Sequence, residues 1–199
     1  MLCVQVARYI DDAVIADGFA MGRMGFAHLV EKGHRRIGII DTTSDERIAQ
    51  DVRKGATAAL QKVGIAFKDL PRICNNVSEL NVNKPWKLGQ QAAAQLLKQH
   101  SDLTALVGIN PHLALGAYRA AQQANMKVPK DISILALEND LTIFNMTDPT
   151  ISVVDTPLED MAERAMIQLV CSPNFMINYT NKFLTNIMED KSLNALLDL

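Results

Sequence analysis

Hydrophobic and polar positions follow one repeated unit along this chain. A short apolar run rich in β-branched residues ends in polar residues, and an amphipathic helical pattern follows it. The apolar runs lie at residues 36–40, 72–74, 105–109 and 132–137. Strands of this length that alternate with helices are typical of βαβ units, whose parallel sheet is buried on both faces. The pattern therefore predicts an α/β fold.

Helical spacing of apolar residues predicts helices over about residues 17–33, 48–64, 86–99 and 110–124. Asp17 is suited to cap the first of them, and Gly33 to end it in the left-handed conformation. Gly22 and Gly25 lie inside that helix, where each costs about 1 kcal/mol relative to Ala. We expect close packing on a sheet to compensate for that cost.

Helix start signals are clear in the second half of the chain. Asn110 and Pro111 form an N-cap followed by proline at the first helical position. Thr156, Pro157 and Glu159 have the form of a capping box, which predicts a helix from that point. Weaker patterns predict strands at 4–7 and 14–16 and a short amphipathic helix at 193–197.

Composition narrows the classes of function. The 199 residues carry a net charge of −2, which gives no electrostatic reason to expect binding to nucleic acid or to an anionic membrane. Cys3, Cys74 and Cys171 lack metal-ligand spacing and suit a reducing compartment. The first residues resemble neither a signal peptide nor a membrane anchor. We therefore expect a cytoplasmic protein with no metal or cofactor.

Five stretches together resemble the effector-binding domain of the lac/gal-repressor family of bacterial transcription regulators. The first is Asp17 together with residues 28–40, and the second is 51–55. The third is Asn110 together with residues 114–117, and the last two are 128–135 and 148–154. Their order and spacing agree with the family over roughly residues 4–170. The resemblance implies a type I periplasmic-binding-protein-like fold, in which the chain crosses between two parallel βαβ subdomains.

The same resemblance implies a division of the chain. Residues 34–149 are expected to form a nearly complete C-terminal Rossmann-like subdomain. Residues 1–33 and 150–168 are expected to form a truncated N-terminal subdomain, and residues 169–199 a tail that packs on the C-terminal one. The family's DNA-binding helix-turn-helix has no counterpart in this chain.

Two candidate ligand contacts follow from the resemblance. Arg53, in the stretch Arg53-Lys54-Gly55, is similar to a family arginine that hydrogen-bonds effector hydroxyls, and a guanidinium fork suits vicinal hydroxyls or a carboxylate. The alternative is a surface arginine paired with Asp51 or Glu46. Asn110 is expected to contact the ligand as well as cap its helix, although Pro111 replaces the acidic residue that family members often have next.

Further candidates lie near the same strand ends. Glu138 aligns with the aspartate that closes the family's Gly-aromatic-Asp motif, which here reads Ala136-Leu137-Glu138. It could accept hydrogen bonds from vicinal hydroxyls, unless it is only a solvated loop charge. Asn139 is a weaker neighbour. Trp86, the only tryptophan, could stack on a sugar or base ring or could simply pack under a loop. His34 is expected to make a structural hydrogen bond.

The function that these features predict is sensing of a small sugar-like or nucleoside-like effector by a LacI-type regulator, expected to act as a homodimer. DNA would be reached only through a helix-turn-helix outside this chain. The alternatives are a stand-alone sugar-binding protein of the same fold and an α/β enzyme. Against an enzyme, the sequence has no GxSxG elbow, no GxxxxGK[ST] phosphate loop, no GxGxxG and no His-Glu metal helix.

Overall fold

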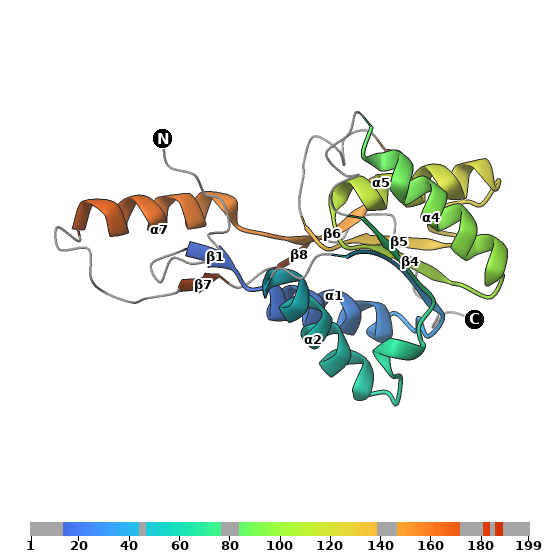
Figure 1. The fold of residues 1–199 in the computed structure, drawn as a ribbon, viewed down its shortest axis with the longest axis horizontal. Helices are drawn as coiled ribbons and strands as arrows, with labels where there is room; N and C mark the ends of the chain where they lie inside the picture. Colours follow the sequence, from blue (N-terminus) through green and yellow to red (C-terminus); the bar gives the residue numbers. More distant parts are fainter. Residues whose placement is uncertain are drawn as a thin grey trace.

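A six-stranded sheet forms the centre of the molecule (Figure 1). The computed structural model describes residues 14–43, 47–76, 84–138, 147–171, 181–183 and 186–188. The strand order is β3-β2-β4-β5-β6-β8, and all neighbours are parallel except β8, which runs antiparallel to β6. The strands are β2 (Ile37–Thr42), β3 (Arg72–Asn75), β4 (Ala105–Gly108), β5 (Ser133–Ala136), β6 (Ser152–Asp155) and β8 (Asn186–Met188).

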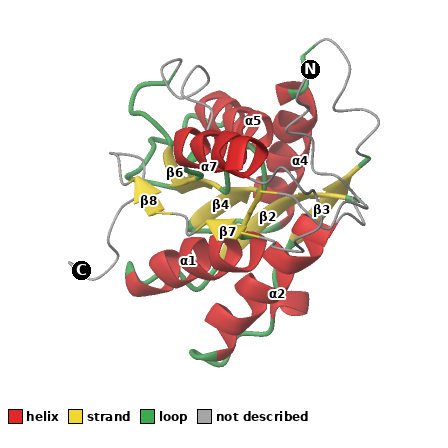
Figure 2. Ribbon diagram, turned by 90° about the vertical axis from the view of Figure 1, so that its left-hand side faces the viewer, coloured by secondary structure: helices red, strands yellow, loops and turns green. Residues whose placement is uncertain are grey.

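Two pairs of helices cover the sheet, one pair on each face (Figure 2). Helices α1 (Gly18–Glu31) and α2 (Arg47–Gln61) lie on one face, and α4 (Trp86–Gln99) and α5 (Pro111–Gln123) on the other. A short 3-10 helix, η1 (Phe67–Asp69), leads from α2 into β3. Alternate residues of β2 point into the two resulting cores: Ile37 and Ile39 join the α1–α2 side, and Ile40 joins the α4–α5 side. Both faces of the sheet are therefore buried, as the apolar runs predict.

The predicted helix ends are confirmed in this part of the chain. Asp17 accepts a hydrogen bond from the amide of Ala20 at 3.1 Å, and Asn110 accepts one from Leu113 at 2.9 Å. Gly33 has a φ of +91° just after α1, as expected of a left-handed helix terminator.

A smaller unit lies beside the main body. Strand β1 (Val14–Ala16) pairs in parallel with β7 (Asn181–Phe183), and α7 (Leu158–Cys171) packs against β1. Figure 1 shows the three elements together, at the left and away from the six-stranded sheet. None of the described helices combines the length and the apolar character that crossing a bilayer requires.

The structure corrects the expected assignment of two elements to the N-terminal part. Helix α1 belongs to the main body, because Phe26 and Leu29 are buried in the same core as Ile39 and Leu135. Strand β6 pairs with β5 within the large sheet. Hydrophobic burial on the sheet therefore places the chain crossings before α1 and after β6, rather than at residues 33 and 150. Strand β8 of the expected tail also joins the large sheet.

The capping box at Thr156 is not formed. Helix α7 begins at Leu158, whose amide donates to the carbonyl oxygen of Thr156 at 2.8 Å. The buried hydroxyl of Thr156 has no hydrogen-bond partner within the described part of the chain. Strand β6 ends at Asp155, just before this position. The helix begins at Leu158, one residue after Pro157, the first helical position that the motif predicts. The expected strand at 4–7 and helix at 193–197 lie outside the described residues.

Candidate functional site

Three predicted site positions lie level with one another at the carboxyl edge of the sheet. In the strand register Ile40 lies opposite Gly108, and Gly108 lies opposite Ala136. Arg53 donates a hydrogen bond to the carbonyl oxygen of Thr42, two residues after Ile40. Asn110 and Glu138 likewise follow their strand positions by two residues.

The ladder continues past the strand ends, which keeps these residues in register. The amide of Ile109 donates to Ile40 at 3.1 Å, and that of Leu137 donates to Gly108 at 3.0 Å. Neighbouring strands lie about 4.8 Å apart. The end of β2, Asn110 and Glu138 thus form a row of polar groups roughly 10 Å long, which is the size of a small metabolite.

A buried carboxylate organises one end of this row. Asp41, at the end of β2, is 1% exposed and accepts hydrogen bonds from Nε and Nη2 of Arg53 at 3.1 and 3.3 Å. Nη1 of Arg72 donates to the same carboxylate at 3.3 Å, and the amide of Thr42 donates at 2.7 Å. Because four donors surround Asp41, its charge is well compensated in the core.

The structure pairs Arg53 with Asp41 and not with Asp51, while Glu46, the other partner considered from the sequence, lies outside the described residues. Asp51 pairs with Lys54 at 2.9 Å and with Arg47 at 3.9 Å. The contacts of Arg53 with Asp41 and Thr42 use Nε and Nη2. The side chain is 24% exposed, so the guanidinium reaches solvent at the edge of the sheet.

Asp41 and Arg72 are functional-site candidates that the sequence did not single out. Asp41 follows four apolar residues of β2 and is recognisable as strand-end polarity. Arg72 begins another strand, and only the pairing of β2 with β3 brings it within reach of Asp41. Its guanidinium also lies 5.5 Å from the ring centroid of Phe67, a cation–π contact that helps to hold it.

The other predicted residues differ in their surroundings. Asn110 is half-buried and acts as the N-cap of α5, so its side-chain oxygen is already engaged. Glu138 is exposed at the end of β5. Asn139 lies outside the described residues. Its role at the site stays a prediction.

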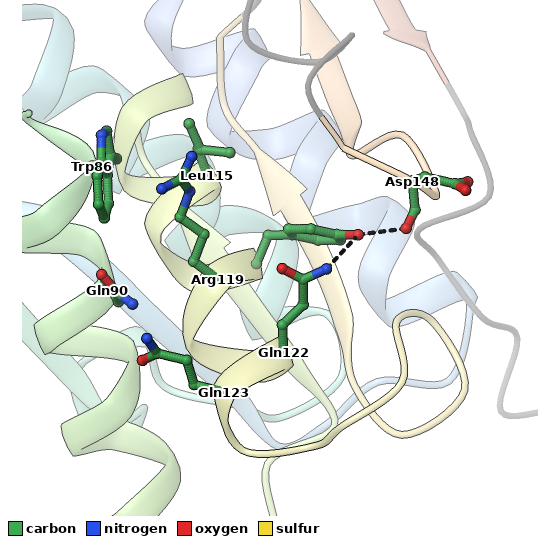
Figure 3. A pocket seen from close by; sticks show the side chains of 8 residues that line it. Trp86, Gln90, Leu115, Arg119, Gln122, Gln123 and Asp148 are labelled. Atoms are coloured by element: carbon green, nitrogen blue, oxygen red, sulfur yellow. Dashed lines mark hydrogen bonds between the residues drawn. The ribbon is translucent and has the colours of Figure 1, made fainter.

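Trp86 lies in a separate groove on the outer side of α4 and α5 (Figure 3). The guanidinium of Arg119 lies 4.0 Å from the centroid of the indole ring. The groove has a volume of about 600 Å³, and at its far side the Tyr118 hydroxyl donates to the carbonyl oxygen of Asp148. Gln122 Nε2 donates to the same hydroxyl at 3.2 Å. The structure thus partners Trp86 with an arginine and does not bring it to Arg53.

Two further expectations concern chemistry. His34 is buried, and its Nδ1 lies 2.9 Å from the Thr104 hydroxyl, which confirms a structural hydrogen bond. In the described residues no group of three or more His, Cys, Asp or Glu side chains could hold a metal ion.

Comparison with known proteins identifies the family. The periplasmic binding protein-like domain family matches residues 26–172, most of the chain. The chain belongs to this family. The match covers the sheet from β2 to β6 together with α2, α4 and α5, and so includes every described element of the polar row.

Curated relatives of this family member are transcription regulators. The regulator GalS of Salmonella typhimurium is 31% identical over 163 residues, which are 80% of this chain and 45% of that protein. The ribose operon repressor of Haemophilus influenzae is 27% identical over 166 residues, 82% of this chain and 48% of that protein. The chain thus spans about half the length of the curated relatives it matches. The resemblance to the lac/gal-repressor family is confirmed.

Solved structures confirm the type I fold. A transcription regulator from Lactobacillus plantarum superposes with a TM-score of 0.81 at 21% identity, covering 94% of this chain and 71% of that one. A LacI family regulator from Enterococcus faecium, crystallised with bound ribose, gives a TM-score of 0.78 at 21% identity, covering 93% and 66%.

Proposed function

We propose that this chain senses a small polar effector for a LacI-type transcription regulator, with Arg53, Asn110 and Glu138 as its contacts. The observation that carries the proposal is the level row of these positions at the carboxyl edge of β2, β4 and β5. Ligands of open α/β sheets bind outside this edge. The regulatory relatives support the same function.

The rest of the proposal concerns partners and location. The protein acts as a cytoplasmic homodimer without enzymatic activity, and it reaches DNA through a helix-turn-helix domain outside these 199 residues. Effector binding shifts an equilibrium between conformations that the dimer transmits to DNA. Sedimentation velocity over a range of concentrations tests the dimer. A sedimentation coefficient that stays monomeric at high concentration would contradict it.

A thermal-shift screen with sugars, nucleosides and purines tests effector binding. A ligand that binds only the native state stabilises it by about 2.7 kcal/mol at a concentration of one hundred times its Kd. We expect a stabilising hit among the sugars or nucleosides. Conversion of that ligand to a product during prolonged incubation would instead favour the α/β enzyme. Binding of the ligand by a protein that carries no DNA-binding domain would favour the stand-alone sugar-binding protein.

The Arg53→Ala variant tests the site itself. Loss of a charge-assisted hydrogen bond should weaken binding of the confirmed ligand by about 1.5–3 kcal/mol in calorimetry. Arg36→Ala is the matched control, because Arg36 pairs with Asp102 at the opposite, amino end of the strands. Unchanged affinity in Arg53→Ala would show that the family role does not carry over to this position.

A further inference from the structure

The groove on the outer side of α4 and α5 takes no part in effector binding as proposed (Figure 3). Its floor is formed in part by Leu115 and Tyr118, which are only 4% and 5% exposed. The two helices that carry its walls are in direct contact, because a Cβ on Gly116 would lie 2.3 Å from the carbonyl oxygen of Trp86. The floor of the groove is therefore a fixed surface.

A stacked arginine lies on one side of this groove. The guanidinium of Arg119 lies 4.0 Å from the centroid of the Trp86 indole ring, and both side chains are half-buried. The cation–π contact gives the N–H groups of Arg119 no oxygen acceptor. Within the described part of the chain, no carboxylate pairs with Arg119. Because the indole restrains the guanidinium, less side-chain entropy is lost when Arg119 binds an acceptor.

A carboxylate lies on the other side. Asp148 is exposed, and the Tyr118 hydroxyl holds its backbone by donating to the carbonyl oxygen. Among the described residues, no cation pairs with the Asp148 side chain, and Arg119 does not reach it. Figure 3 shows the two charged side chains on opposite sides of the groove. The groove thus presents one cation and one anion, each without an ion-pair partner in the described chain.

This arrangement is complementary to itself. In a contact about a two-fold axis, residue i of one copy meets residue j of the other, and j meets i. A half-turn therefore places Arg119 opposite Asp148 twice, whereas a ligand of single charge would match only one of them. The eight lining residues include Trp, Tyr and Arg, which are enriched at the centres of interfaces, and no Lys or Glu. The glutamine amides among them both donate and accept, so they can pair with amides of a second copy.

We propose that this groove is the contact surface between two copies of the chain, in which Arg119 of each copy pairs with Asp148 of the other. The inference rests on the homodimer of the proposed function and names the surface that forms it. Trp86 is the anchor, since it restrains Arg119 and loses its contact with water when the second copy docks. Gln122 and Gln123, which are exposed, lie at the rim.

Charge reversal at the two positions tests the pairing, with the dimer dissociation constant measured by sedimentation velocity over a dilution series. Arg119→Asp alone and Asp148→Arg alone should each raise this constant at least about a hundredfold, because like charges then face each other at both symmetric contacts. An equimolar mixture of the two variants should associate within about fivefold of the unmodified chain, because each contact of a mixed pair again joins an acid and a base. Mixing cannot repair a folding defect, so this recovery is specific to a contact between copies.

A matched pair of reversals provides the control. Arg36 and Asp102 pair at 3.3 Å on the surface, at the amino end of the strands. Arg36→Asp and Asp102→Arg should each change the dissociation constant by less than about twofold, since long-range effects between exposed charges are screened by salt.

Fluorescence of the unmodified chain gives a second measurement that needs no variant. Trp86 is the only tryptophan of the sequence, so it alone supplies the indole emission. Docking of a second copy removes water from the ring. The emission should therefore move to shorter wavelength as the concentration passes through the dissociation constant found by sedimentation.

The outcomes separate this inference from the proposed function. A dimer that both reversals leave intact, or that forms without a change in Trp86 emission, would place the contact elsewhere while the homodimer stands. Folded variants that stay monomeric when mixed would show that the two side chains do not meet across copies. A chain that is monomeric at every concentration would overturn the homodimer and this inference, while effector sensing stands. A change in Trp86 emission on adding a sugar or nucleoside to the monomer would make the groove a ligand site instead.

Discussion

Asp41 determines how the arginines at the sheet edge are arranged. It is buried at the end of β2, where an unpaired carboxylate would be strongly unfavourable. Arg53 reaches it from α2 and Arg72 reaches it from β3, so one side chain connects three elements. The same contacts hold both guanidinium groups at the edge where a ligand would bind. Stability and the proposed binding of an effector therefore depend on one group.

Replacing Asp41 with Asn should reveal this dependence. The change leaves two guanidinium groups without their shared counter-charge, and we expect the free energy of unfolding to fall by about 3 kcal/mol. That is the lower end for a broken buried pair, because both arginines keep contact with water. Urea denaturation at neutral pH measures the loss.

Asp102→Asn provides the control for this measurement. Asp102 pairs with Arg36 on the surface, at 3.3 Å, with the two side chains 56% and 69% exposed. Exposed pairs contribute less than about 1 kcal/mol. Equal losses in the two variants would contradict a special role for the buried carboxylate.

Close contact between α1 and α2 explains the glycines of both helices. A Cβ on Gly22 would lie 2.0 Å from the carbonyl oxygen of Val52, and one on Gly55 would lie 2.0 Å from that of Phe19. Gly25 faces the sheet instead, where a Cβ would meet the side chain of Leu137 at 2.5 Å. Packing on the sheet, the reason predicted for Gly22 and Gly25, therefore applies to Gly25, whereas Gly22 packs on α2.

Gly55→Ala should destabilise the protein although alanine favours helices. The intrinsic gain of about 1 kcal/mol is outweighed by overlap with backbone atoms, which forces α1 and α2 apart. We expect a net loss of about 1–3 kcal/mol in urea denaturation. Lys54→Ala, at an exposed neighbouring position of the same helix, should change stability by less than about 0.5 kcal/mol. A stabilised Gly55→Ala protein would show that the helices can separate at little cost.

Stability is expected to differ between the main body and the smaller unit. Helix α1 is buried against α2 and the sheet, whereas Leu158 and Met166 of α7 are 59% and 55% exposed. Strand β1 pairs over only three residues with β7. A two-stranded sheet by itself is marginal in water. This unit should therefore open more readily than the body.

Hydrogen exchange should show this difference. Amides of α1 in its second half, around Phe26 and Leu29, should be protected as strongly as those of β2, because both belong to one core. Amides of β1 should exchange much faster. This outcome replaces the division at residue 33 expected from the sequence, under which α1 would move with the N-terminal part. Fast exchange throughout α1 would restore that division.

These 199 residues by themselves should not bind operator DNA. Their net charge of −2 means that phosphate attraction, which supplies most of the affinity of DNA-binding proteins, is weak. A gel shift at physiological salt should show no specific retention below micromolar concentration, in the presence or absence of effector. A basic DNA-binding domain tested with the same operator DNA is the positive control. Sequence-specific retention by this chain would contradict the proposal that DNA contact requires another domain.

Local patterns were sufficient for much of the fold. Strand and helix positions depend on the period of apolar residues, and helix ends depend on neighbours within a few residues, so α4 was predicted at its observed bounds, Trp86–Gln99. The carboxyl-edge positions of Arg53, Asn110 and Glu138 also follow from the order of strand and helix, together with the family resemblance. Thr156 shows the limit of such signals, since a capping motif did not produce the cap.

Long-range packing decided the remaining features. Arg72 lies 31 residues from Asp41 in the chain, and only the register of β2 and β3 makes them partners. The assignment of α1 and β6 to the main body depends on which apolar surface each element buries, and the same helical or strand pattern is compatible with either subdomain. Trp86 likewise contacts Arg119 because α4 and α5 pack closely against each other. Pattern along a chain specifies what an element must bury, whereas the partner is chosen by the free energy of packing the complete set of elements.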